Sequence, residues 1–106
     1  GFIPGEVVRF PDRADLIVPH MGWNTVEHGP AAKPGALLHG VKPGEYFYFV
    51  HSYFAQPADP SVVALTCDYG GPFTAAISRG NCHATQFHPE KSQAAGAGLL
   101  NAFANL

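Results

Sequence analysis

Aromatic and β-branched residues gather in short runs separated by glycine and proline, and this pattern predicts a strand-rich chain. The strongest run covers residues 46–54, Tyr-Phe-Tyr-Phe-Val-His-Ser-Tyr-Phe, in which both faces are apolar. A strand that is apolar on both faces is typical of a central strand covered on each side. Similar runs predict further strands near residues 7–10 and over residues 62–67, 73–77 and 82–87.

Glycine, proline and asparagine interrupt the apolar pattern at three places. Gly22 and Asn24 break it within residues 20–26, where we expect a shaped loop that leads into a strand. Residues 28–36 contain two prolines and two glycines and predict a second loop, and residues 41–45 predict a turn.

The last segment of the chain changes to helical spacing. Ala95, Leu99, Ala102 and Leu106 recur at intervals of three or four residues, as do Leu100 and Phe103. Ser92 precedes this pattern and is a residue type favoured at a helix N-cap. We therefore expect one amphipathic helix that runs from Ser92 to about Leu106 and closes a single domain over residues 1–106.

Composition narrows the class of protein. Charged residues make up 13% of the 106 residues, against about 25% in an average soluble domain, so much of the surface is expected to meet other protein. The six basic residues are scattered and the net charge is −2, which argues against nucleic-acid binding. No apolar run approaches the roughly 18 residues of a membrane span. Two cysteines and no secretory signal favour a reduced, cytoplasmic setting, and the missing initiator methionine suggests a chain that begins within a longer protein.

Candidate chemistry lies in residues 84–92, Ala-Thr-Gln-Phe-His-Pro-Glu-Lys-Ser. If this segment is extended, His88 and Glu90 point to the same side because strand side chains alternate with a period of two. A carboxylate beside an imidazole fixes the ring's tautomer and stabilises its cation. The pair has the form of a general base and its orienting group, and lacks a nucleophile.

Three motifs together resemble one known family. Residues 18–24 (Val-Pro-His-Met-Gly-Trp-Asn), 48–53 (Tyr-Phe-Val-His-Ser-Tyr) and 86–92 (Gln-Phe-His-Pro-Glu-Lys-Ser) resemble, in this order, motifs of the glutaminase subunit of imidazole glycerol phosphate synthase, a class I (triad) glutamine amidotransferase of histidine biosynthesis. The resemblance implies an α/β, flavodoxin-like fold, an open sheet with helices on both faces, of which this chain is the C-terminal half. It implies no cofactor.

The resemblance also assigns roles to individual residues. In the Cys-His-Glu triad that hydrolyses glutamine, His88 matches the general base and Glu90 its orienter, while Ser52 and Tyr53 match positions that line the glutamine pocket. Other matching positions face the synthase (cyclase) partner, a (β/α)8 barrel that receives the ammonia: His20, Met21, Gly22, Trp23, Asn24 and Lys91.

The nucleophile is the large departure from the family pattern. The family carries it in a Gly-x-Cys-x-Gly elbow, whereas Cys67 lies in Leu-Thr-Cys-Asp-Tyr and Cys82 in Gly-Asn-Cys-His-Ala. Cys82 precedes His88 by six residues, which in an extended strand is roughly 20 Å. We therefore expect the chain alone to be inactive as a glutaminase.

Two other interpretations stay open at this point. A chain without its nucleophile could be a non-catalytic module that self-associates through an uncovered sheet or binds a partner. Alternatively, His20 and His51 could bind zinc together with His88, Glu90 or Cys67. The metal site is the less favoured of the two, because no two histidines are four residues apart and there is no C-x-x-C motif.

Overall fold

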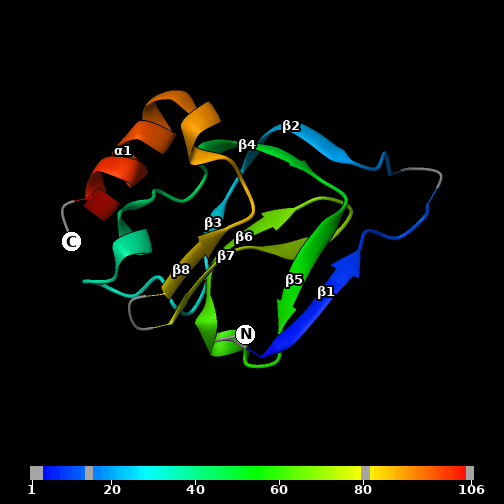
Figure 1. Cartoon of the computed structure of the whole chain (residues 1–106), viewed down its shortest axis with the longest axis horizontal. Coiled ribbons are helices and arrows are strands. Elements are labelled where there is room, and N and C mark those ends of the chain that lie inside the picture. The colour runs from blue at the N-terminus through cyan, green and yellow to red at the C-terminus, as the bar shows by residue number, and fades with distance from the viewer. Residues whose placement is uncertain (1–3, 14–15, 80–81, 105–106) are drawn as a thin grey trace.

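The computed structural model describes residues 4–13, 16–79 and 82–104, and shows a strand-rich chain that ends in one α-helix (Figure 1). The described residues also form three short 3-10 turns, two between strands and one before the helix. The strands are β1 (Gly5–Arg9), β2 (His20–Thr25), β3 (Glu27–His28), β4 (Tyr46–His51), β5 (Tyr53–Pro57), β6 (Val63–Asp68), β7 (Pro72–Arg79) and β8 (Cys82–Thr85). The turns and the helix are η1 (Leu37–Gly40), η2 (Pro60–Val62), η3 (Pro89–Lys91) and α1 (Gln93–Ala104).

The strands form three small sheets, and every strand pair among the described residues is antiparallel. β1 pairs with β5, β2 pairs with β4, and a four-stranded sheet has the order β3-β6-β7-β8. In Figure 1 the β1–β5 ribbon lies at one end of the molecule and α1 at the other, with the four-stranded sheet between them. The predicted strand-rich fold with a single C-terminal helix is confirmed.

The long aromatic run 46–54 is two strands, so its prediction as one central strand is wrong. Ser52 separates β4 from β5, and the two strands pair with different partners. Phe47 and Phe49 are fully buried, but Tyr46 on the opposite face is 60% exposed. No second layer covers that outer face in the described part of the chain, so its aromatic side chains reach the surface.

The expected shaped loop over residues 20–26 is also wrong, because residues 20–25 form β2. The strand runs in unbroken register along β4, from His20 opposite His51 to Thr25 opposite Tyr46. Gly22 has a φ of +126°, a conformation open mainly to glycine, and the pairing continues through it. The edge of β4 supplies hydrogen-bond partners for the backbone of residues 20–25. The residue types in that segment, glycine and asparagine among them, do not reveal this pairing.

The other predicted elements hold with shifted ends. The strands predicted over 62–67, 73–77 and 82–87 correspond to β6, β7 and β8. The predicted helix corresponds to α1, and its predicted end at Leu106 lies outside the described residues. Among the described residues no helix has the length and hydrophobicity needed to cross a membrane.

Aromatic rings dominate the core, which lies between β4, the β6–β7 pair and the C-terminal segment. The rings of Phe47 and Phe87 are 4.1 Å apart, and Phe49 and Phe73 meet edge to face at 5.8 Å. From α1 the core receives Leu99. This packing anchors both the strand that precedes His88 and the helix that follows Glu90.

Candidate active site

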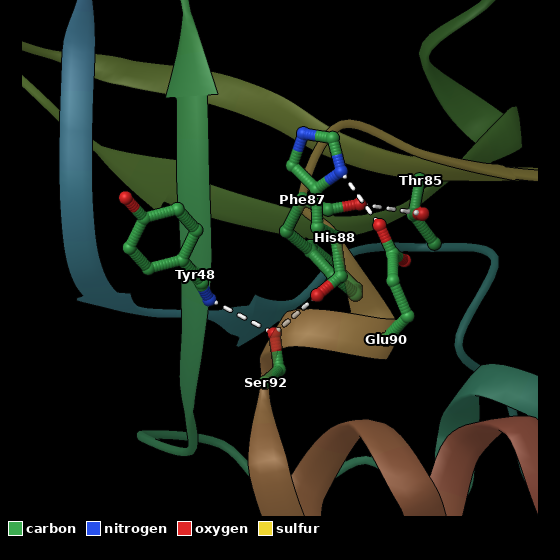
Figure 2. A network of polar contacts seen from close by, with 6 residues as sticks. All are labelled: Tyr48, Thr85, Phe87, His88, Glu90 and Ser92. Carbon is green, nitrogen blue, oxygen red and sulfur yellow. Dashed lines mark hydrogen bonds and ion pairs between the residues drawn. The ribbon is translucent and has the colours of Figure 1, made fainter.

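His88 and Glu90 touch at the turn between β8 and α1. The Nδ1 atom of His88 lies 2.9 Å from the Oε1 atom of Glu90, and the side chains are 37% and 59% exposed (Figure 2). The sequence predicted the pair on an extended segment, but Glu90 lies inside the 3-10 turn η3. His88 precedes this turn and has extended dihedral angles, φ −101° and ψ 98°. The turn rather than strand alternation therefore brings the carboxylate to the ring.

The contact determines which ring nitrogen is available for chemistry. Hydrogen bonds to its own backbone N–H and to His88 lower the pKa of the Glu90 carboxyl, so the group is ionised near neutral pH. An ionised carboxylate only accepts hydrogen bonds, so Nδ1 of a neutral His88 carries the proton and Nε2 keeps its lone pair. In Figure 2 the second ring nitrogen points away from Glu90. The arrangement suits a general base that acts through Nε2.

Ser92 holds the backbone of His88 against β4. Its hydroxyl is buried, accepts a hydrogen bond from the N–H of Tyr48 at 2.9 Å and donates one to the carbonyl of His88 at 2.6 Å (Figure 2). The N–H of His88 in turn donates to the carbonyl of Tyr48 at 3.0 Å. These bonds replace the N-cap that the sequence predicted for Ser92: the hydroxyl joins two segments instead of capping α1.

The glutamine-pocket candidates Ser52 and Tyr53 lie at the corner between β4 and β5. Ser52 is half-buried, and Tyr53 is 52% exposed. Burial lowers the pKa of the adjacent His51, and its hydrogen bond to the carbonyl of Tyr53 opposes this effect. The N–H of His88 bonds to the carbonyl of Tyr48 on the same strand as His51, so the corner and the His88–Glu90 pair both adjoin β4.

The cysteines provide no nucleophile for this pair. Burial, together with the charge of Asp68, raises the pKa of Cys67 to about 12, the opposite of what a reactive thiolate needs. Cys82 is exposed on β8. Neither thiol is hydrogen-bonded to His88 within the described residues, as expected from the missing Gly-x-Cys-x-Gly motif.

The metal interpretation finds no geometric support. His20 and His51 bond to each other, with Nδ1 of His20 2.9 Å from Nε2 of His51. Among residues 4–13, 16–79 and 82–104 no three His, Cys, Asp or Glu side chains are arranged to hold a metal ion.

Alternation along β2 divides the predicted partner-facing segment into two faces. Met21 and Trp23 are 63% and 46% exposed, and Trp23 meets the ring of Tyr48 edge to face at 5.9 Å. Gly22 and Asn24 are half-buried, and Lys91 is exposed in the turn after His88. His20 is 3% exposed and its side chain faces the core, and its place at the partner surface stays a prediction.

Sequence reasoning missed the residues that hold the site in place. The pattern predicted Ser92 as a helix cap rather than as a partner of His88, and it did not predict the close approach of α1 to the turn at Gly96. A signal was present, because glycine inside a helical pattern usually has a packing reason. An ideal Cβ on Gly96 would lie 1.7 Å from the carbonyl oxygen of Pro89.

Comparisons with known proteins identify the family of the chain. The family model "Glutamine amidotransferase class-I" matches residues 5–105. Curated relatives named "Imidazole glycerol phosphate synthase subunit HisH" include one from Rhodopirellula baltica, 61% identical over 98% of this chain and 49% of that protein. Another, from Methylococcus capsulatus, is 51% identical over 97% of this chain and 49% of its own length. The chain thus spans about half the length of the curated relatives it matches. With a family model matched over nearly all of its residues, the chain belongs to the class I glutamine amidotransferase family.

Proposed function

We propose that this chain is the base-and-orienter half of a glutamine amidotransferase that releases ammonia from glutamine for imidazole glycerol phosphate synthesis in histidine biosynthesis. The observation that carries the proposal is the 2.9 Å contact between Nδ1 of His88 and Oε1 of Glu90, which leaves Nε2 of His88 as a base. The names of the relatives support the choice of pathway.

In the proposed reaction a cysteine from outside this sequence attacks the side-chain amide carbon of glutamine. His88 takes the thiol proton on Nε2 and passes it to the departing nitrogen, which leaves as ammonia while a thioester forms. His88 then takes a proton from water as the water attacks the thioester, and returns it to the sulfur as glutamate departs. Glu90 stabilises the imidazolium that forms in both halves of the cycle.

Ser52 and Tyr53 are proposed to line the glutamine pocket. Their corner follows His51 at the end of β4, and β4 also carries Tyr48, whose carbonyl accepts the N–H of His88 at 3.0 Å. The exposed Tyr53 side chain and the half-buried Ser52 leave groups available to a ligand.

The ammonia acceptor is proposed to be a cyclase subunit with a (β/α)8 barrel that docks on the outer face of the β2–β4 pair. Met21 and Trp23 project from this face, and Lys91 lies exposed in the turn next to Glu90. An exposed tryptophan braced by a neighbouring aromatic ring is a typical anchor at a protein interface. Such a surface beside the His88–Glu90 pair suits a partner that takes up a product released there.

A chimera tests the function directly. The corresponding half of the Rhodopirellula baltica relative is replaced by this chain, and glutamate release is measured with a glutamate dehydrogenase assay. We expect a chimera with glutaminase activity that the His88→Asn variant abolishes, and no activity from the 106-residue chain alone. An inactive but folded chimera would favour the non-catalytic module, and light scattering would then show whether the chain self-associates.

A further inference from the structure

Polar groups form a continuous hydrogen-bonded row where β4 passes into β5. Nδ2 of Asn24 lies 3.3 Å from Nε2 of His20, and Nδ1 of His20 lies 2.9 Å from Nε2 of His51. Nδ1 of His51 lies 2.9 Å from the carbonyl oxygen of Tyr53. We call Asn24, His20, His51 and the Tyr53 carbonyl the histidine relay.

The orientation of the Asn24 amide is fixed by two further contacts. Its Oδ1 accepts a hydrogen bond from the N–H of Thr25 at 2.8 Å, and its Nδ2 donates to the carbonyl of Asp68 at 3.0 Å. The amide nitrogen therefore faces His20, and it can only donate. Nε2 of His20 must accept this bond with its lone pair.

The opposite end of the relay imposes the same direction of donors and acceptors. The carbonyl of Tyr53 can only accept, so Nδ1 of His51 carries a hydrogen. Neutral His51 then accepts on Nε2, and the donor is Nδ1–H of His20. Both ends thus select one arrangement, in which the two rings are neutral and protonated on Nδ1. A proton added to either Nε2 would set two donors against each other.

Aromatic packing encloses the two rings and keeps them neutral. His20 stacks between Phe49 and Tyr69, with ring centroids 4.9 Å and 4.0 Å away, and Phe10 lies 5.0 Å from His51. Burial and, second, the charge of His51 lower the pKa of His20 to about 4. Every buried side-chain nitrogen or oxygen among the described residues has a hydrogen-bond partner, so the relay carries no unsatisfied group.

The relay adds side-chain hydrogen bonds to a corner whose backbone passes from one strand pair to another. Ser52 is the single residue between β4 and β5, which pair with different strands. The carbonyl of Ser52 accepts the N–H of Phe10 at 3.0 Å, and the next carbonyl, that of Tyr53, accepts the His51 ring. His20 and His51 are register partners, so the corner is tied through the relay to β2.

We propose that the histidine relay fixes the Ser52–Tyr53 backbone and that His20 and His51 are therefore positioning residues for the glutamine pocket. The inference rests on the proposed function of this corner. In this proposal both histidines act only through the direction of their hydrogen bonds. Neither ring needs to contact glutamine or to bind a metal ion.

The order of hydrogen atoms is tested on the 106-residue chain itself. Long-range proton–nitrogen NMR spectra at pH 7, assigned with the His20→Asn and His51→Asn variants, should show both rings protonated on Nδ1 and unprotonated on Nε2. A spectrum in which either ring carries its hydrogen on Nε2, or on both nitrogens, overturns the relay.

The positioning role is tested by glutamine kinetics in the chimera. His51→Phe keeps an aromatic ring but removes both bonds, and the KM for glutamine should rise roughly five- to tenfold, with a smaller change in kcat, because a pocket-shaping hydrogen bond is lost. His51→Asn places an amide N–H near the former Nδ1 and should restore most of the affinity. His39→Phe is the matched control, because it removes a similar 3.0 Å ring-to-carbonyl bond, to Ala32, away from the corner.

Each kinetic outcome separates this inference from the proposed function. An inactive unmodified chimera would sink the proposed function, whereas the NMR result on the chain would still stand. An active chimera in which His51→Phe leaves KM unchanged, or in which His51→Asn is as impaired as His51→Phe, overturns the positioning role. If His51→Phe does not fold, the KM for glutamine is measured in His20→Phe instead. This variant keeps the stacking on Phe49 and Tyr69 but removes the donor to His51.

Discussion

The carbonyl oxygen of Pro89 occupies the space that a side chain at position 96 would need, since an ideal Cβ on Gly96 would lie 1.7 Å from it. Pro89 separates His88 from Glu90, so the first turn of α1 packs directly against the backbone of the candidate active site. A single missing methyl group allows this helix to support the turn that pairs the imidazole with the carboxylate.

Replacing Gly96 with alanine should therefore destabilise the chain despite the better helix propensity of alanine. Overpacking costs about 1–3 kcal/mol and occasionally more, and a contact of 1.7 Å with a backbone oxygen lies at the upper end of that range, above the helix propensity gain of roughly 1 kcal/mol. Gly98→Ala is the matched control, because no atom lies within 4 Å of the position its Cβ would take, and it should stabilise by roughly 0.5–1 kcal/mol. Urea unfolding measures both, and equal effects would contradict the close approach.

Ser92→Ala should loosen the attachment of His88 to β4. The substitution leaves the partly buried N–H of Tyr48 without this partner, which costs about 1 kcal/mol of stability. Ser61→Ala, at an exposed serine, should change stability by less than about 0.5 kcal/mol. In the active chimera, Ser92→Ala should also lower kcat more than Ser61→Ala does. A loss of stability with unchanged kcat would show that the hydroxyl serves folding alone.

The sequence predicted the contact of His88 with Glu90 but not its cause. Spacing of two residues suggested strand alternation, whereas a 3-10 turn makes the contact, and local patterns do not distinguish these two geometries over three residues. The break at Ser52 was invisible for a related reason: aromatic residues continue through it, and only the different pairing partners of β4 and β5 reveal it. Likewise β2 is a strand because β4 offers it an edge, a tertiary effect that outweighs the glycine at position 22.

Glu90→Gln should lower kcat of the chimera by about 100-fold or more. The amide can still accept the Nδ1–H of His88 but carries no negative charge to stabilise the imidazolium formed during proton transfer. Glu45→Gln is a suitable control, because Glu45 accepts the N–H of Lys42 in an exposed turn, and its loss should leave kcat unchanged. Steady-state kinetics at saturating glutamine decides, and a Glu90→Gln enzyme with normal kcat would remove Glu90 from the mechanism.

Trp23→Ala should weaken binding of the proposed cyclase partner. An anchoring tryptophan contributes roughly 2 kcal/mol or more at an interface, equivalent to about a thirtyfold rise in Kd. Val7→Ala serves as the control, because Val7 is 74% exposed on β1, away from the β2–β4 face. Calorimetric titration with the partner measures both affinities, and similar Kd values for the two variants would place the interface elsewhere.

Acid should destabilise the chain in a pH range set by the buried histidines. The pKa of His20 falls from 6.5 to about 4 on folding, and burial lowers that of His51 as well. Between pH 6.5 and about 4 the unfolded chain binds more protons than the folded chain. The stability that the neutral rings maintain above pH 6.5 is therefore lost as pH falls toward 4. For His20 the full loss corresponds to about 3 kcal/mol.

Two exposed carboxyl groups, Glu90 and Asp59, have lowered pKa values, and their contribution is lost only below the ordinary carboxyl pKa near 4. Unfolding by urea at several pH values between 7.5 and 5 therefore isolates the histidines. The wild-type free energy of unfolding should decrease across this range, and it should decrease less in the His20→Phe variant, which keeps the aromatic stacking but cannot take up a proton. Parallel curves for the two proteins would mean that His20 does not remain neutral in the folded chain, contrary to its place in the histidine relay.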